Sequence, residues 1–305
     1  MKNLTAIIFL FTLLVSCSEN DSFPENPKAP EEPLAKIYRL PIVVHVIHKG
    51  ESIGTGGNLS DERILRQIEI LNEDFRRKEG TRGFNDHPEG DDAKIEFVLA
   101  DKDPNGDDTT GIVREQFRPE EIPDEVPNFE FERFAHFSYW PSEDYINVWV
   151  APYGEFTNIL LGMSTGPFSD LPGSDLFQEP LPGGAEGIIV NWAHFGESDV
   201  DGGHNLGRTL THEMGHYLGL LHTWGANDCE ANDYCDDTPA VDKKVSASEP
   251  YLGCAGEDVM VANYMNYSPD HIMNIFTKEQ IARMHHVIKN SPRRTSLLTS
   301  KGLTQ

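Results

Sequence analysis

The sequence has few basic residues, and this shortage excludes one class of partner. It contains 25 lysine and arginine residues against 50 aspartate and glutamate residues, which gives a formal net charge of -25 at pH 7. A field of this sign repels nucleic acid and anionic membrane surfaces, and it favours cationic partners such as calcium or basic peptide segments. We therefore expect no nucleic-acid partner.

Three further features are missing. The apolar run Leu4–Val15 is too short to span a bilayer comfortably. The four cysteines include no CxxC pair, which argues against a zinc site built from cysteine. No internal repeat occurs at the spacings of solenoid proteins. The 305 residues are enough for one large domain or two smaller ones.

The N-terminus has the pattern of an export signal. Residues 1–16 carry Lys2 and then the apolar run, which ends in Leu14-Val15-Ser16 and is followed by Cys17. This ending resembles the bacterial lipobox, in which cleavage precedes a cysteine that becomes lipidated. We expect a lipid on Cys17 to be the protein's contact with the membrane, at the outer membrane or cell surface. A plain secretion signal is the alternative, and mass spectrometry of the mature N-terminus distinguishes the two.

Beyond the signal, the pattern predicts a tether followed by alternating strands and helices. Residues 17–36 are rich in acids and proline and have little to bury, so we expect a flexible tether. Apolar periodicity, caps and turn residues then predict the elements. We expect strands at 40–47, 95–100, 145–150, 159–163 and 187–191, helices starting at Ser60 and spanning 205–218 and 278–289, and a frayed tail from Thr295.

One stretch carries the chemistry. Residues 212–222 have the pattern HExxHxxGxxH. Residues four apart share a helix face, so His212 and His216 can offer two imidazole nitrogens to one metal ion, and Glu213 can reach a metal-bound water as general base. Gly219 lets the chain leave the helix so that His222 can return as a third ligand. Three imidazoles and one open position are typical of catalytic zinc.

The chain after His222 is irregular and rich in Asp, Asn and Gly. We expect a bound ion and a disulfide to order it rather than a core. In an oxidising compartment the cysteines at 229, 235 and 254 favour a disulfide, and because three is odd, one stays free or pairs outside the chain.

Several motifs together resemble the pappalysin family of metzincin zinc peptidases. The resemblance runs from about Lys36 to Asn290. It implies an α+β metzincin fold, with a five-stranded mixed sheet and two long helices over an irregular C-terminal subdomain. The catalytic domain would span 37–295, divided into 37–222 and 223–295, with a tail at 296–305. The motifs are the long zinc pattern, Tyr38-Arg39-Leu40-Pro41-Ile42-Val43-Val44-His45-Val46, Leu71-Asn72-Glu73-Asp74-Phe75, Asp236-Asp237-Thr238-Pro239, Asn263-Tyr264-Met265-Asn266-Tyr267 and Met273-Asn274-Ile275-Phe276-Thr277.

The resemblance also implies roles for individual residues. Zinc would be held by His212, His216 and His222, and Glu213 would activate the attacking water. Met265 would form an apolar floor beneath the metal. Tyr267 would stabilise the tetrahedral oxyanion.

The C-terminal half carries further implied features. Asp233 and Thr238 match a loop that can bind calcium, with a solvated acidic loop as the alternative. Asp270 would line the pocket for the residue after the scissile bond and favour Arg or Lys there. Cys229 and Cys254 match a family disulfide. Ile272 stands where the family often has another cysteine, which leaves Cys235 without an obvious partner and keeps a Cys235 to Cys254 bridge open.

These observations favour an exported zinc endopeptidase that acts on proteins or peptides. The peptide would add to the sheet's edge strand near residues 160–165. The alternative is a non-catalytic surface lipoprotein that binds a protein or glycan ligand on a metalloprotease fold. A calcium-buffering lipoprotein would explain the charge but not the spacing at 212–222.

Overall fold

The computed structural model describes residues 36–152, 160–177, 184–200, 202–227, 229–230, 233–246 and 252–304. The expected signal, Cys17 and the tether up to residue 35 lie outside this part of the chain. Among the described residues, no helix is both long and apolar enough to cross a membrane.

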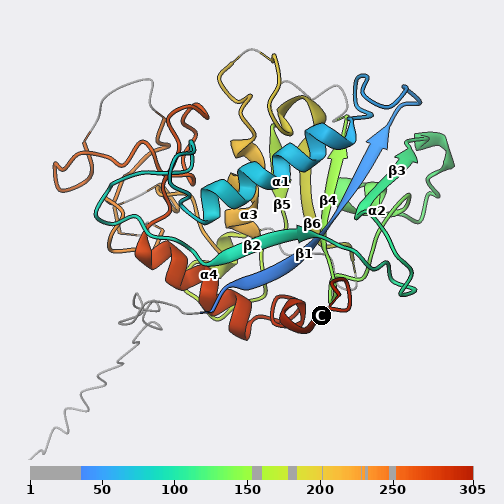
Figure 1. Ribbon diagram of the computed structural model, residues 1–305. Helices are drawn as coiled ribbons and strands as arrows, with labels where there is room; N and C mark the ends of the chain where they lie inside the picture. The colour runs from blue at the N-terminus through green and yellow to red at the C-terminus, as the bar shows by residue number, and fades with distance from the viewer. Residues whose placement is uncertain are drawn as a thin grey trace, which may run out of the picture.

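A mixed sheet forms the centre of the molecule (Figure 1). Its strands lie in the order β2-β1-β4-β6-β5, and all neighbours are parallel except β5, which runs antiparallel to β6 at one edge. The mixed sheet predicted from the sequence is therefore confirmed. The strands are β1 Tyr38–His48, β2 Ile95–Leu99, β4 Ile146–Ala151, β5 Gly162–Ser164 and β6 Gly187–Asn191.

A sixth strand, β3 (Ile112–Gln116), exceeds the predicted five. Strand β1 is long enough for its first half to pair with β2 and its second half to pair with β3 on the same edge. All five residues of β3 are half-buried, and three of them are polar, so the segment lacks the alternation that marks a strand in a sequence.

Helices cover both faces of the sheet. On one face, alternate residues of β1 share a core with α1 (Asp61–Phe75), α3 (Arg208–Tyr217) and α4 (Lys278–Asn290). Figure 1 shows α1 crossing the near face of the sheet. On the other face, Trp149 and Ile189 pack against the short helix α2 (Glu130–Ala135). This arrangement follows from strand geometry, because successive side chains point to opposite faces.

The ends of the helices follow local rules that the sequence predicted. Ser60 caps α1, where its hydroxyl accepts from the main-chain N–H of Arg63. Thr277 and Gln280 form the predicted capping box of α4. Helix α3 starts after Gly207, which has a φ of +84°. The remaining helical turns are short 3-10 segments at Pro119–Glu121, Ser174–Leu176, Trp192–His194 and Ser296–Thr299.

A buried polar network joins α1 to the helix that carries the zinc motif. Asp74 accepts hydrogen bonds from the Arg208 guanidinium at 3.0 Å and from the Thr211 hydroxyl at 2.7 Å. All three side chains are buried. Removing one partner of such a buried pair typically costs about 3–5 kcal/mol, so this network fixes where α3 lies on the core.

The C-terminal part has few regular elements apart from α4. A disulfide joins Cys229 to Cys254, and Cys235 is a buried free thiol. The prediction of a frayed tail from Thr295 is wrong. Leu297 is buried in the main core, and the Ser300 hydroxyl donates to the carbonyl of Asp144, so the tail packs back against the start of β4.

Candidate active site

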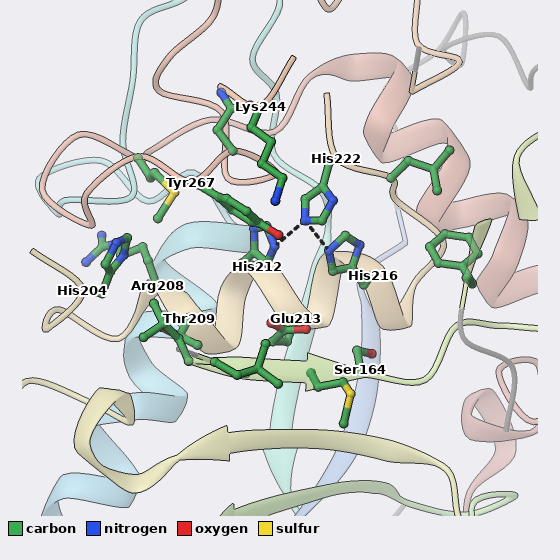
Figure 2. Close-up of a pocket in the computed structure, with 18 of the residues that line it drawn as sticks. Ser164, His204, Arg208, Thr209, His212, Glu213, His216, His222, Lys244 and Tyr267 are labelled. Atoms are coloured by element: carbon green, nitrogen blue, oxygen red, sulfur yellow. Dashed lines mark hydrogen bonds between the residues drawn. The ribbon is translucent and has the colours of Figure 1, made fainter. Parts of the chain in front are cut away.

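Three histidine side chains converge at the bottom of a cleft of about 880 Å³. His212 and His216 lie one turn apart on α3, and His222 comes from the segment that follows (Figure 2). The Nε2 atom of His222 lies 3.2 Å from Nε2 of His212 and 3.2 Å from Nε2 of His216. Ligands about 2.0–2.1 Å from a tetrahedral zinc ion are roughly 3.3 Å apart, so the three nitrogens fit zinc.

The turn after α3 depends on glycine, as the sequence predicted. Gly219 has a φ of +92°, which other residues rarely adopt. A Cβ atom there would also lie 2.6 Å from Cγ2 of Val287 on α4. Both the backbone conformation and the close approach of α4 therefore require glycine at the point where the chain turns back with His222.

Main-chain carbonyl groups orient two of the imidazoles. Nδ1 of His212 lies 2.7 Å from the carbonyl oxygen of Tyr264, and Nδ1 of His216 lies 2.7 Å from that of Leu220. Each Nδ1 therefore carries the hydrogen, which leaves the Nε2 lone pair for a metal. Burial lowers the pKa of His212 to about 3 and that of His216 to about 4, so both rings are neutral, as metal binding requires.

Two side chains from later in the chain pack near the histidines, Trp224 on the His222 ring and Met265 against Gly215 of α3. The Trp224 ring stacks on the His222 ring at 4.3 Å between centroids, with 11° between the planes. Met265 is fully buried below α3. A Cβ atom on Gly215 would lie 2.5 Å from its sulfur atom, so Met265 can occupy this place only because α3 has a glycine there.

The turn that carries Met265 is tied to α4. The Asn263 side chain accepts from the Met265 main-chain N–H at 2.9 Å. It also exchanges two hydrogen bonds with the side chain of Gln280, at 2.9 and 3.1 Å. The carbonyl of Tyr264 that orients His212 is thus held by an anchored turn.

Glu213 lies between α3 and β5, beside the histidines but not among the converging nitrogens (Figure 2). Burial raises the pKa of its carboxyl group to about 8. The group therefore exchanges its proton close to neutral pH, in a position beside the three imidazoles.

Tyr267 stands at the cleft with 45% of its surface exposed. Its ring centroid lies 4.9 Å from that of His222 and 4.8 Å from that of Trp224. The ammonium group of Lys244 lies 5.4 Å from the same ring. Burial, followed by the charge of Glu213, raises the pKa of the Tyr267 hydroxyl, which therefore stays a hydrogen-bond donor at neutral pH.

Comparisons with known proteins identify the family of this chain. The Peptidase_M43 family model (Pregnancy-associated plasma protein-A) matches residues 132–289. Mature mirolysin of Tannerella forsythia, solved in complex with a cleaved peptide, is 33% identical with a TM-score of 0.70, over 87% of this chain and 96% of that chain. This chain belongs to the pappalysin family. The family is one of metzincin metalloendopeptidases, so membership implies a catalytic zinc ion.

Other relatives support the pappalysin assignment. A Tannerella forsythia promirolysin mutant is 31% identical with a TM-score of 0.71, over 89% of this chain and 88% of that chain. An extracellular metalloprotease of Verticillium alfalfae is 27% identical over 84% of this chain and 77% of its own length. An extracellular metalloprotease of Colletotrichum graminicola is 44% identical over 27% of this chain, and that match spans 31% of its own length. The chain thus covers about a third of the length of this relative.

Asp270 of this pappalysin lines the cleft, but its carboxylate is partly used in hydrogen bonds to the start of α3. Its Oδ2 accepts from the main-chain N–H groups of Leu206 and Arg208 at the start of α3, at 2.8 and 3.2 Å. Its Oδ1 is buried, has no hydrogen-bond partner among the described residues and lies 3.5 Å from Nδ1 of His204. One carboxylate oxygen therefore holds the start of α3, and the other lies beside His204.

The acidic loop near Asp233 is compact. Asp233 is buried, and its Oδ1 accepts from the Thr238 hydroxyl at 2.7 Å and the Cys235 main-chain N–H at 3.2 Å. Its Oδ2 and Oδ1 of Asp237 are buried without hydrogen-bond partners in the described part of the chain. Burial raises the pKa of Asp233 to about 7. Asp233 is therefore shielded from solvent, whereas Asp236 in the same loop is exposed.

Sequence reasoning missed some residues that shape the site. Trp224, the Leu220 carbonyl and Lys244 gave no signal, because each acts through a tertiary contact. Gly162 and Gly215 could have been noticed, because a glycine inside a strand or a helix costs stability and often marks a close approach.

Proposed function

We propose that this chain is an exported zinc-dependent endopeptidase in which Glu213 is the general base. The observation that carries the proposal is the convergence of three Nε2 atoms beside a buried carboxylate, in a cleft whose wall includes β5. Export is supported by relatives that are named extracellular metalloproteases. Lipidation of Cys17 stays a prediction from the sequence.

The edge strand supports a polypeptide substrate. Strand β5 pairs with β6 on one side, and β5 residues line the cleft on the other. An extended peptide can add to such an edge through main-chain hydrogen bonds. The mirolysin structure contains a cleaved peptide, which supports the same class of substrate here.

Each group then has a task in hydrolysis. Zinc, when held by His212, His216 and His222, supplies a Lewis acid for the carbonyl oxygen and a more acidic water. Glu213 takes the proton from the attacking water and gives it to the leaving amine. The Tyr267 hydroxyl donates a hydrogen bond to the oxyanion. Met265 contributes by packing below the ligand helix.

The Glu213→Gln variant tests the proposed base. Glutamine keeps the size of the side chain but cannot accept the proton, so we expect kcat to fall by roughly 10²–10⁴-fold while zinc stays bound. Cleavage of a denatured protein and zinc content should be measured together, with chelator-treated wild-type protein as the control. Full activity of a zinc-loaded Glu213→Gln protein would contradict the role. Wild-type protein that holds zinc but cleaves nothing would favour the non-catalytic ligand-binding alternative.

Asp270 is proposed to select a basic residue after the scissile bond. Its buried Oδ1 accepts no hydrogen bond from the described part of the structure and lies 3.5 Å from Nδ1 of His204, and both residues line the cleft of a protein whose net charge also favours cationic ligands. A buried carboxylate with one free oxygen offers a charge-assisted hydrogen bond to Arg or Lys.

The Asp270→Asn variant tests this selection. Asparagine keeps an oxygen for the N–H groups of Leu206 and Arg208 but removes the charge. Loss of one partner of a buried charge pair costs about 2–5 kcal/mol, so we expect kcat/KM for Arg at that position to fall at least roughly 30-fold. A peptide with Leu at the same position is the control and should change little. Cleavage-site mapping of the wild type that shows no basic preference would overturn the proposal.

A structural calcium ion at the Asp233 loop is proposed as well. The support is the pair of buried, unpartnered carboxylate oxygens on Asp233 and Asp237, with Thr238 adjacent. Carboxylate oxygens are the ligands that calcium prefers, and a bound cation would offset the cost of burying them.

Thermal unfolding tests the calcium site. We expect saturating calcium to raise the Tm of the wild type by on the order of 5 °C, as binding to the folded state alone predicts. The increase should be lost in Asp233→Asn. It should remain in Asp107→Asn, which changes an exposed acid in another loop. Equal shifts in all three proteins would show that calcium acts elsewhere.

A further inference from the structure

Strand β5 has a glycine where it passes the catalytic helix. Gly162 pairs with Val190 of β6 and lines the cleft. An ideal Cβ atom on Gly162 would lie 2.7 Å from Cγ and 2.9 Å from Oε1 of Glu213, and 3.0 Å from Cγ2 of Thr209. Real Cβ atoms essentially never lie closer than 3.0 Å to a neighbouring heavy atom, so any side chain here would force a neighbouring group to move.

The backbone gives no other reason for glycine at this position. Gly162 is not among the residues with positive φ, and it lies in an extended strand with a regular antiparallel partner. In such a strand glycine is less favourable than almost any other residue. The presence of glycine at position 162 is therefore explained by the space that its missing side chain leaves, and not by a special backbone conformation.

The geometry also indicates which group would yield to a methyl group. Strand β5 is held by β6, and α3 is held by the buried network of Asp74, Arg208 and Thr211. The two nearest atoms, Cγ and Oε1, belong to the Glu213 side chain, which can move by rotating about its Cα–Cβ bond without moving the backbone, whereas the third contact, with Cγ2 of Thr209, is longer at 3.0 Å. Figure 2 shows this side chain extending from α3 toward β5. A side chain at position 162 would thus displace the Glu213 carboxylate rather than destabilise the fold.

We infer that Gly162 is a positioning residue for hydrolysis: the space it leaves on β5 admits the Glu213 carboxylate and sets its place in the cleft. The inference rests on the proposed role of Glu213 as the base. It has a consequence for the whole site, because the strand proposed to hold the peptide also determines where the base stands. Substrate and base are then aligned by one element. A displacement of about 1 Å in such an arrangement can cost on the order of 10²-fold in rate.

The Gly162→Ala variant, prepared as the zinc-loaded full chain, tests the inference. We expect kcat to fall roughly 10- to 100-fold, with KM within about two-fold of the wild type and with unchanged zinc content and Tm. A crystal structure of the variant should show the Glu213 carboxylate displaced while the three imidazoles stay in place. Gly162→Ser, with a larger side chain, should lose more kcat than Gly162→Ala.

Gly57→Ala is the matched control. Gly57 also lacks a positive φ, lies outside the cleft and would place its Cβ 3.7 Å from the nearest atom, on Trp192. This variant should keep full activity and stability. It separates the effect of the contact with Glu213 from the general effect of adding a methyl group to a glycine.

Each other outcome decides against the inference. Unchanged kcat in zinc-loaded Gly162→Ala would show that Glu213 does not need the space. A raised KM with unchanged kcat would assign Gly162 to peptide binding. Unfolding, or a Tm that falls in step with activity, would assign it to packing. Glu213→Gln in the same assay separates the two proposals. If Glu213→Gln is active, Glu213 is not the general base. If Glu213→Gln is inactive while Gly162→Ala has normal activity, only the positioning role of Gly162 is refuted.

Discussion

Two main-chain carbonyl groups, of Leu220 and Tyr264, set the constraint on which the rest of the site depends. Each accepts the Nδ1 hydrogen of a histidine on α3, and so turns Nε2 toward the centre of the cleft. Side chains could not do this as rigidly, because a carbonyl in an anchored turn has no rotamers to lose. The convergence of the three nitrogens is therefore a property of the backbone path around α3 as much as of the histidines.

This constraint explains why two parts of the chain must meet at the site. The Leu220 carbonyl belongs to the turn that Gly219 permits, whereas the Tyr264 carbonyl belongs to a segment that follows the irregular region. That later segment is held by Gln280 of α4 through Asn263, and α4 in turn packs on the same core as β1 and α1. The disulfide between Cys229 and Cys254 closes the irregular region between the two carbonyls. The fold thus joins the two halves of the metal site through one core.

The sequence predicted the parts of the structure whose signals are local. The histidine spacing, the turn at Gly219, the capping box of Thr277 and Gln280 and the β-branched run of β1 each depend on residues within a few positions of one another. Strand β3 and the ordered tail were missed because they are defined by partners far along the chain, namely the second half of β1 and the start of β4. For the same reason, no pattern in the sequence could place Trp224 on His222 or Gly162 against Glu213. The sequence predicted that Asp270 lines the substrate cleft, but it did not predict the hydrogen bonds that Asp270 accepts from the start of α3.

The central claim is that one zinc ion is held by three imidazoles, two of which are oriented by main-chain carbonyl groups. X-ray absorption spectroscopy of the zinc-loaded protein, together with its zinc content, tests this claim most directly. We predict one zinc ion per chain, with three imidazole nitrogens at about 2.0–2.1 Å and no sulfur ligand, and loss of the zinc in His222→Ala. A protein that retains no zinc, or a spectrum with a sulfur ligand from Cys235, would contradict the account.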